Sequence, residues 1–309
     1  MTLRSCFAIL GVLAAALHPA ILQAADAESH GRNYDEAKVG AYTLPDPLTA
    51  GDGTRIADAA SWRAKRRPEI LKAFEDLMYG LTPPLSVKLR AETIAFRTDA
   101  LDGLATRTVA NLRFFEDPAA PVIQLLLYVP NAVRKPAPVF LGLNYYGNAS
   151  LEKDHSIPLP TQWMRPSAEM GIVNNRATEA TRGAHASRWP LDAILKRGYA
   201  VATFYYGDVE PDHIDGWRDG IRGYALKFSG REQHARDDWG ALGAWAWGLS
   251  RVLDFLETRP EVDARRVAVL GHSRHGKAAL WAGAQDERFA MVMSNKGAEG
   301  AAWLDRRDL

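Results

Sequence analysis

Residues 266–281 read RVAVLGHSRHGKAALW, and this stretch decides the fold expected for the 309-residue chain. The apolar run Val267–Leu270 predicts a buried strand, and Lys277–Ala284 predicts a helix a few positions later. Ser273 lies between them, with a glycine on either side. A strand, a sharp turn and a helix in this order are typical of a nucleophile elbow, which presents a serine hydroxyl at the carboxyl edge of a sheet.

The spacing of the glycines around Ser273 departs from the usual elbow. It is G-x-S-x-x-G instead of G-x-S-x-G, and His275 stands where a small residue is usual. In an elbow, Ser273 is the nucleophile, and the first backbone N–H groups of the helix face the oxyanion that its attack creates. The alternative is a serine that caps the helix after a buried strand and has no chemical role.

Further strands and helices are predicted on the N-terminal side of the elbow and after it. Apolar or alternating runs predict strands at Val87–Phe96, Leu104–Phe115, Val122–Val129, Val139–Leu143, Tyr199–Tyr206 and Phe289–Met293. Helices are expected at Trp62–Tyr79, Leu191–Lys196 and Asp237–Glu257, and polar loops at 149–188 and 207–230. Strands that alternate with helices in the second half indicate a three-layer α/β-hydrolase sandwich around a mostly parallel sheet.

The first predicted helix has a recognisable start, face and end. Ser61 is expected to cap it, and Gly80 to close it. Its apolar residues fall mostly on one helical face: Trp62, Ile70, Phe74, Leu77 and Met78.

The N-terminus has the features of a secretory signal peptide. Arg4 precedes the apolar run Cys6–Leu17, and small residues lead to Ala25. We therefore expect cleavage near Ala25 and an exported protein, periplasmic or extracellular, with residues 26–309 forming one partial hydrolase domain. A permanent anchor is the weaker reading, because the apolar run is short for a bilayer span.

Composition excludes several classes of function. The 38 basic and 37 acidic residues leave a net charge of +1, so no excess field draws the chain to nucleic acid or to anionic lipid. The only cysteine, Cys6, lies in the predicted signal peptide. Residues 26–309 therefore have no disulfide, no catalytic thiolate and no cysteine–zinc site. Composition leaves the oligomeric state open.

The elbow segment resembles a known family. Gly271–Lys277, which reads GHSRHGK, is similar to the G-[C/H]-S-R-x-G-K signature of the glucuronoyl esterases, carbohydrate esterase family 15. Other segments resemble the bacterial members in the same order: Tyr34–Gly40, Gly142–Asn148, Asn175–Glu179, Ser187–Pro190, Tyr205–Asp208 and Leu280–Phe289.

The resemblance implies roles for three residues. Ser273 would be the nucleophile, Arg274 would stabilise the oxyanion, and Lys277 would hydrogen-bond hydroxyls of the sugar acid. The substrate would be glucuronoxylan or a lignin–carbohydrate ester, cleaved between 4-O-methyl-glucuronic acid and a lignin alcohol. The family works through a serine acyl-enzyme and uses no metal or other cofactor.

The resemblance breaks at the base and the acid of the triad. After Ser273 the only histidine is His275, which would have to fold back onto its own turn. Lys296 stands where many members carry glutamate, and Glu299 does not align with that position. The family's catalytic histidine lies beyond residue 309, so we predict a domain that is incomplete at its C-terminus and hydrolyses no ester by itself.

Two other functions stay open. One is another carboxylesterase on the same fold, such as an acetyl-xylan esterase, although the donor Lys277 suits a sugar-acid pocket better. The other is a non-catalytic carbohydrate-binding remnant of an esterase.

Three further groups of residues have competing interpretations. Three histidines and four carboxylates in the second half have no metal-ligand spacing, so solvated loop charges are expected at His185, His213, His234, Asp208, Glu210, Asp212 and Asp215. Trp239, Trp245 and Trp247 predict core packing over sugar stacking. The segment Asn144–Asn148 is either a plain loop or a source of oxyanion or sugar contacts.

Overall fold

The computed structural model describes residues 36–133 and 136–297. The predicted signal peptide, residues 1–25, lies outside these ranges and stays a prediction. Glu299, which does not align with the acid of the family, also lies outside them. In the described part of the chain, no helix combines the length and the apolar character that a bilayer crossing requires.

The chain divides into two compact units. One comprises Met1–Asp46 and Leu304–Leu309, and its described part begins with the short 3-10 helix η1 (Glu36–Val39). The other comprises Pro47–Trp303 and contains the predicted elbow.

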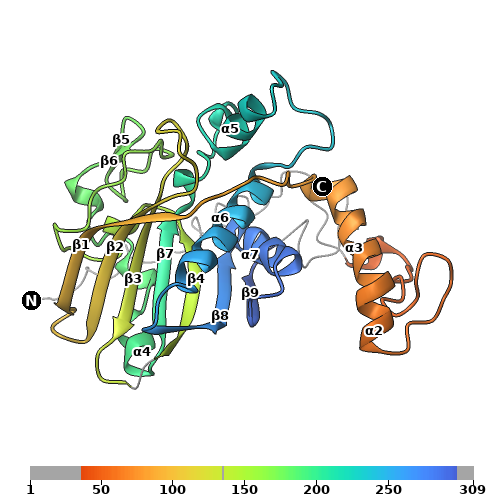
Figure 1. Cartoon of the computed structure of the whole chain (residues 1–309), viewed down its shortest axis with the longest axis horizontal. Coiled ribbons are helices and arrows are strands. Elements are labelled where there is room, and N and C mark those ends of the chain that lie inside the picture. The colour runs from red at the N-terminus through yellow and green to blue at the C-terminus, as the bar shows by residue number, and fades with distance from the viewer. Residues whose placement is uncertain (1–35, 134–135, 298–309) are drawn as a thin grey trace, which may run out of the picture. The chain divides into compact units, whose positions relative to one another are not determined.

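A seven-stranded mixed sheet forms the centre of the second unit, with the strand order β1-β2-β3-β7-β4-β8-β9 (Figure 1). The strands are β1 (Arg90–Ala100), β2 (Ala105–Arg113), β3 (Ile123–Pro130), β7 (Ala200–Tyr205), β4 (Ala137–Asn144), β8 (Val262–His272) and β9 (Met291–Asn295). Strands β7, β4, β8 and β9 pair in parallel, whereas β1, β2 and β3 form an antiparallel edge that meets β7. Strands β5 (Ile172–Val173) and β6 (Arg176–Ala177) form a separate small ladder. The predicted α/β-hydrolase architecture is thereby confirmed.

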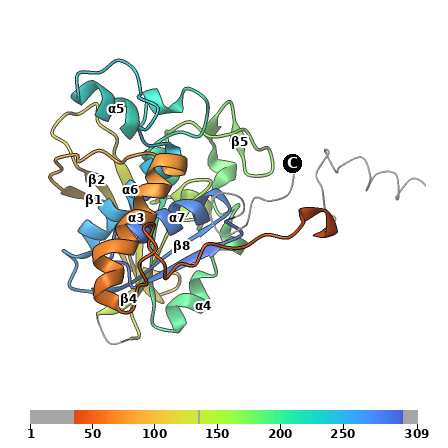
Figure 2. The same cartoon turned by 90° about the vertical axis from the view of Figure 1, so that its right-hand side faces the viewer.

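Both faces of the sheet are covered, because neighbouring residues of a strand pack into different cores. On β3, Leu125 and Leu127 belong to one apolar cluster, while Leu126 and Tyr128 belong to the other. The first cluster packs against α6 (Ala241–Leu256) and α7 (Arg274–Gln285), and the second against α4 (Leu191–Lys196). Figure 2 shows α4 on the opposite side of the sheet from α6. The predicted core packing of the three tryptophans is confirmed for Trp239, Trp245 and Trp247.

The first predicted helix is present, but its cap and its face differ from the prediction. It runs as α2 (Ala59–Ser61), η2 (Trp62–Arg66), α3 (Arg67–Phe74) and η3 (Glu75–Tyr79). Asp58 is the N-cap, and Ser61 is its partner three residues on: the Ser61 N–H donates to Asp58 Oδ1 at 2.7 Å. Sequence reasoning placed the cap at the wrong end of this pair.

The apolar face of this helix is only partly covered. Leu77 is 86% exposed, and Phe74 and Met78 are exposed as well, whereas Tyr79 is buried against Trp281 of α7. Gly80 ends the helix at a φ of 75°, where a Cβ atom would lie 2.2 Å from the Asp238 carbonyl oxygen. The chain therefore turns at Gly80 because the backbone of another segment passes directly over it.

The segment predicted as a polar loop at 207–230 contains a helix. Helix α5 (Ile221–Phe228) buries Ile221, Ala225 and Leu226 on one side. Its N-cap, Gly220, makes no side-chain cap, and only a few apolar residues stand among polar ones. The sequence therefore lacked the signal that usually marks the start of a helix, and packing against other parts of the chain stabilises α5.

Candidate active site

Ser273 adopts the strained backbone of an elbow between β8 and α7. Its φ is 55° and its ψ is −127°, a region that residues with a side chain rarely occupy. Its backbone N–H donates to the Asn295 carbonyl oxygen of β9 at 2.9 Å, which fixes the turn to the neighbouring strand. Strain of roughly 1–3 kcal/mol persists only where the surroundings hold it, and such positions cluster at functional sites.

The two glycines of the segment are needed for close packing of strand and helix. A Cβ atom on Gly271 would lie 2.1 Å from the His275 carbonyl oxygen, and one on Gly276 would lie 3.1 Å from the Gly271 carbonyl oxygen and from Ser294 Oγ. The shifted second glycine of G-x-S-x-x-G therefore still faces the turn. The departure from the usual spacing preserves the elbow.

The Ser273 side chain does not cap α7. It accepts no hydrogen bond from the first turn of the helix, while its backbone carbonyl accepts the Lys277 N–H at 3.1 Å. The hydroxyl instead contacts the phenol of Tyr145 and remains partly exposed. The interpretation of Ser273 as a silent helix cap is therefore wrong.

Arg274 lies beside the serine and is held from two sides. Its guanidinium forms a short ion pair with Asp212, and its Cζ atom lies 5.8 Å from the centroid of the Tyr145 ring. The Tyr145 hydroxyl donates to the His272 carbonyl oxygen at 2.7 Å, so this ring touches both strand end and arginine. Burial raises the pKa of Tyr145, while the Arg274 charge and the contact with Ser273 oppose that rise. The Arg274 guanidinium and the Ser273 side chain therefore share one neighbour, Tyr145.

Tyr145 and Asp212 were not predicted as parts of this site. Tyr145 lay within the ambiguous segment Asn144–Asn148, and Asp212 was interpreted as a solvated loop charge. Asp212 instead neutralises and orients Arg274 from 62 positions away. Asp212 and Arg274 lie far apart in the sequence, so their pairing could be recognised only from the fold.

Lys277 follows one turn into α7. Its side chain is partly exposed and forms no ion pair with any residue in 36–133 or 136–297. An ammonium group without a protein counter-ion retains all three donors for a ligand.

Neither neighbouring histidine is placed to act as a base on Ser273. The His275 ring is buried between aromatic side chains, stacked on Tyr145 with centroids 3.8 Å apart, and neither of its nitrogens has a well-formed hydrogen bond within the described structure. Burial holds the pKa of His275 well below its usual range, and the Arg274 charge adds to this. His275 is a neutral core residue, a role that the sequence did not predict; the expectation was only that its place next to the turn keeps it from acting as the base. His272 is exposed and forms no hydrogen bond with Ser273 in the part of the chain that the structure describes.

The segment that would carry the acid shows no carboxylate in reach. Lys296 follows β9 in a left-handed conformation with a φ of 47°, and its side chain is exposed. A lysine cannot replace a glutamate as the acid of a triad, so Lys296 is not that acid.

Two of the predicted loop charges are buried, which corrects the expectation that all are solvated. Asp208 accepts the Gln124 N–H at 3.0 Å, and burial raises the pKa of this carboxyl to about 8. Glu210 pairs with Arg222 at 2.6 Å; burial raises the pKa of Glu210 and the arginine opposes the rise. These carboxyls hold the segment after β7 in place rather than facing water.

The remaining members of that group form no metal site. Asp215 is exposed, and burial lowers the pKa of the partly buried His185. Within the described ranges, no three His, Cys, Asp or Glu side chains gather in a way that would hold a metal ion.

The amide side chains of the segment Asn144–Asn148 serve the scaffold. Asn144 Nδ2 donates to Asn148 Oδ1 at 2.8 Å, and Asn148 Nδ2 donates to the Gln124 carbonyl oxygen at 2.7 Å. Both asparagines are buried. Of the two interpretations left open, the structure favours a plain loop for the asparagines and a place in the site for Tyr145.

A serine on a strained elbow at the carboxyl edge of an α/β sheet defines the serine hydrolases of the α/β-hydrolase class. The structure resembles a glucuronoyl esterase from Solibacter usitatus, with a TM-score of 0.82 and 47% identity over 89% of this chain and 68% of that one. The chain belongs to carbohydrate esterase family 15, the glucuronoyl esterases. A promiscuous esterase of this family from a marine bacterial metagenome is similar, at 44% identity with a TM-score of 0.80, over 89% of this chain and 68% of that one.

Comparison of sequences agrees with this membership. A family model described as "Glucuronyl esterase, fungi" matches residues 187–306. A curated carbohydrate esterase from an unknown prokaryotic organism is 44% identical over 91% of this chain and 64% of its own length. A 4-O-methyl-glucuronoyl methylesterase from Cerrena unicolor is 27% identical over 88% of this chain and 45% of its own length. The chain thus spans between about half and two thirds of these curated relatives.

Proposed function

We propose that this chain forms the serine-bearing part of a glucuronoyl esterase, which cleaves the ester between 4-O-methyl-glucuronic acid on xylan and a lignin alcohol. The single observation that carries the proposal is the strained Ser273, followed by an Arg274 whose guanidinium is held by Asp212 and Tyr145. The names of the relatives supply the substrate class.

The reaction follows from this arrangement. Ser273 Oγ attacks the ester carbonyl carbon, and the carbonyl oxygen becomes an oxyanion beside Arg274 and the first N–H groups of α7. Collapse of this intermediate breaks the bond to the alcohol oxygen, which takes up the proton that the serine lost. Water then cleaves the acyl-enzyme and releases the glucuronate. The base that carries the proton is not among the described residues.

Lys277 favours a sugar acid over an acetyl group as the acyl part. Its uncommitted donors suit ring hydroxyls or the oxygens around a uronate, and an acetyl group offers no such partners. Nothing in the described structure favours the acetyl-xylan esterase alternative by a comparable contact.

The proposal is tested by release of benzyl alcohol from benzyl glucuronate. The 309-residue chain by itself is expected to release none above background. A chimera that continues after residue 297 with the C-terminal part of the Solibacter usitatus esterase is expected to turn over, and Ser273→Ala to abolish this by at least roughly a thousandfold.

Two outcomes would count against the proposal. One is a chimera that melts cooperatively and releases no alcohol. The other is a Ser273→Ala chimera as active as its parent. Release by the chain alone, lost in Ser273→Ala, would instead overturn the expectation that it needs a further segment.

We also propose export, on the strength of residues 1–25. Secretion in a bacterial host should shorten the chain to begin near Asp26, which mass spectrometry of the product measures. A product of full length in the membrane fraction would favour the anchor.

A further inference from the structure

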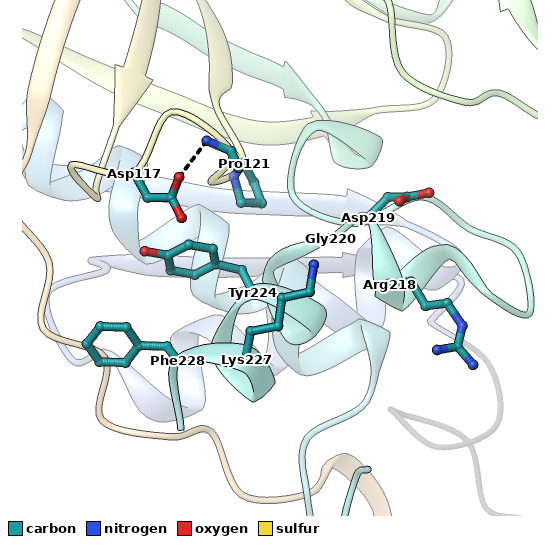
Figure 3. A pocket seen from close by; sticks show the side chains of 9 residues that line it. Asp117, Pro121, Arg218, Asp219, Gly220, Tyr224, Lys227 and Phe228 are labelled. Carbon is teal, nitrogen blue, oxygen red and sulfur yellow. Dashed lines mark hydrogen bonds between the residues drawn. The ribbon is translucent and has the colours of Figure 1, made fainter. Parts of the chain in front are cut away.

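A cavity lies away from Ser273, between α5 and the loop that joins β2 to β3. Its volume is about 450 Å³, within the range of small-molecule sites. Figure 3 shows Tyr224, Lys227 and Phe228 projecting from α5, with Asp117 and Pro121 on the loop opposite. Arg218 and Asp219 complete the rim from the turn before α5.

This cavity opens at the same edge of the sheet as the elbow. Strand β3 runs antiparallel to β7, so the start of β3 lies beside the carboxyl end of β7. The order β3-β7-β4-β8 puts three strand spacings, or about 14 Å, between the cavity's loop and the strand that carries Ser273. The segment after β7 spans this gap, because Asp212 pairs with Arg274 while Arg218 lines the cavity. One extended polymer could lie along the edge and reach both.

One side of the cavity is formed by aromatic side chains that are not fully buried in the core. Phe228 is 72% exposed, and its ring lies nearly parallel to that of Tyr224, with centroids 6.4 Å apart and an angle of 17°. Tyr224 in turn packs on Phe115 at 4.6 Å, which holds the pair in place. A fixed, exposed ring face carries negative potential and attracts the weakly positive C–H edges of an apolar or sugar ring.

The polar side of the cavity is balanced in charge. Lys227 supplies donors, as does Arg218, whose guanidinium also pairs with Asp215 at 3.5 Å, while Asp117 and Asp219 supply acceptors. Lys227 and Asp219 form no ion pair with any of the residues that the structure describes. An anion would face two carboxylates and a cation would face two basic groups. The lining therefore suits an uncharged ligand with many hydroxyl groups.

We infer that this cavity is an accessory site for the neutral main chain of xylan, which it holds while the ester-bearing branch reaches Ser273. The cavity's own chemistry gives the class, a neutral oligosaccharide, and the choice of xylan rests on the proposed function. The site acts on affinity for the polymer and takes no part in ester cleavage.

The test is a calorimetric titration of the chain with xylohexaose, a neutral xylan fragment. Phe228→Ala and Lys227→Ala, both at exposed positions, are expected to weaken binding at least tenfold. Phe96→Ala is the matched control, because Phe96 is 58% exposed on β1 and does not line the cavity. It is expected to bind as the parent does.

The inference is overturned if the parent chain does not bind xylohexaose, or if Phe228→Ala binds as well as the parent. It is also overturned if glucuronic acid binds more tightly than xylohexaose and this preference disappears in Lys227→Ala, since the site would then select an anion. In the active chimera, Phe228→Ala should leave turnover of benzyl glucuronate unchanged. The two proposals can fail separately. If the chain binds xylohexaose, Phe228→Ala removes this binding and the chimera cleaves no ester, the accessory site is supported and only the esterase proposal is rejected.

Discussion

Two segments meet at the candidate site, and they reach their structures by different means. The elbow, residues 266–281, is shaped largely by neighbours in sequence: a Cβ atom on Gly271 would clash with the His275 carbonyl oxygen, and a strained serine lies between a strand and a helix. The segment 206–228 is shaped by partners farther along the chain: the buried Asp208 carboxyl accepts a hydrogen bond from Gln124, 84 positions away, and Glu210 pairs with Arg222, 12 positions away. Its short helix has no side-chain cap. Local patterns predicted the first segment, whereas the second became visible only in the fold.

The contrast between the two segments would be wrong if Asp208, the buried carboxyl of the second segment, behaved like a surface group. The pKa of Asp208 is raised to about 8 in the folded chain, against an ordinary value near 4 when unfolded. Its contribution to stability is therefore complete below about pH 4 and is lost as the pH rises towards 8. Between pH 5 and pH 8, the free energy of unfolding should fall by about 4 kcal/mol more in the parent than in Asp208→Asn, which stays neutral.

Denaturant melts of both proteins at the two pH values measure this difference. All other side chains are the same in both proteins, so their contributions cancel in the difference. Asp215→Asn is the matched control on the same segment, because Asp215 is exposed, and it should follow the parent. Parallel pH profiles for the parent and Asp208→Asn would show that Asp208 is solvated after all.

A second test of this contrast removes one partner of the buried ion pair between Glu210 and Arg222. Arg222→Met leaves Glu210, which is 1% exposed, without its counter-charge. We expect a loss of about 3 kcal/mol in the free energy of unfolding. Arg218→Met, at an exposed position of the same segment, should change stability by less than about 0.5 kcal/mol. Equal losses in both variants would mean that the pair does not organise the segment.

A substitution that adds one methyl group to the elbow tests whether local packing shapes it. Gly271→Ala places a Cβ atom 2.1 Å from a backbone oxygen, and the turn has to open to admit it. We expect a loss of about 2 kcal/mol, measured by thermal or denaturant unfolding. Gly51→Ala is the control, because its Cβ atom would meet nothing closer than 3.9 Å, and its effect should be small. If Gly271→Ala is as stable as Gly51→Ala, local packing does not shape the elbow.

These tests bear on how far sequence reasoning can go in this molecule. Apolar or alternating runs predicted every strand of the large sheet. The central strands β3 and β7 are buried and nearly continuous in apolar residues, whereas β1 is exposed along most of its length and was indicated by alternation. Ser273 and Arg274 followed from the elbow and the family signature. Tyr145, Asp212 and α5 did not, because their roles depend on partners as far as 127 positions away. The apolar face of residues 62–78 shows the converse limit: periodicity predicted a helix and did not predict how much of it stays exposed.

The contact between the two segments gives the last and smallest effect on stability. The Asp212–Arg274 pair is partly exposed on both sides, so Asp212→Asn should change the free energy of unfolding by no more than about 0.5 kcal/mol. Its effect on the reaction should be larger, because Asp212 orients the cation that meets the oxyanion. In the active chimera, we expect Arg274→Ala to lower kcat about a hundredfold, as for the loss of an oxyanion donor. Asp212→Asn should lower kcat by a smaller factor at an unchanged KM for benzyl glucuronate, since Arg274 remains present but less well aligned. A fall in stability without a change in kcat would make Asp212 a structural residue only, and the two segments would then meet at the site without either depending on the other.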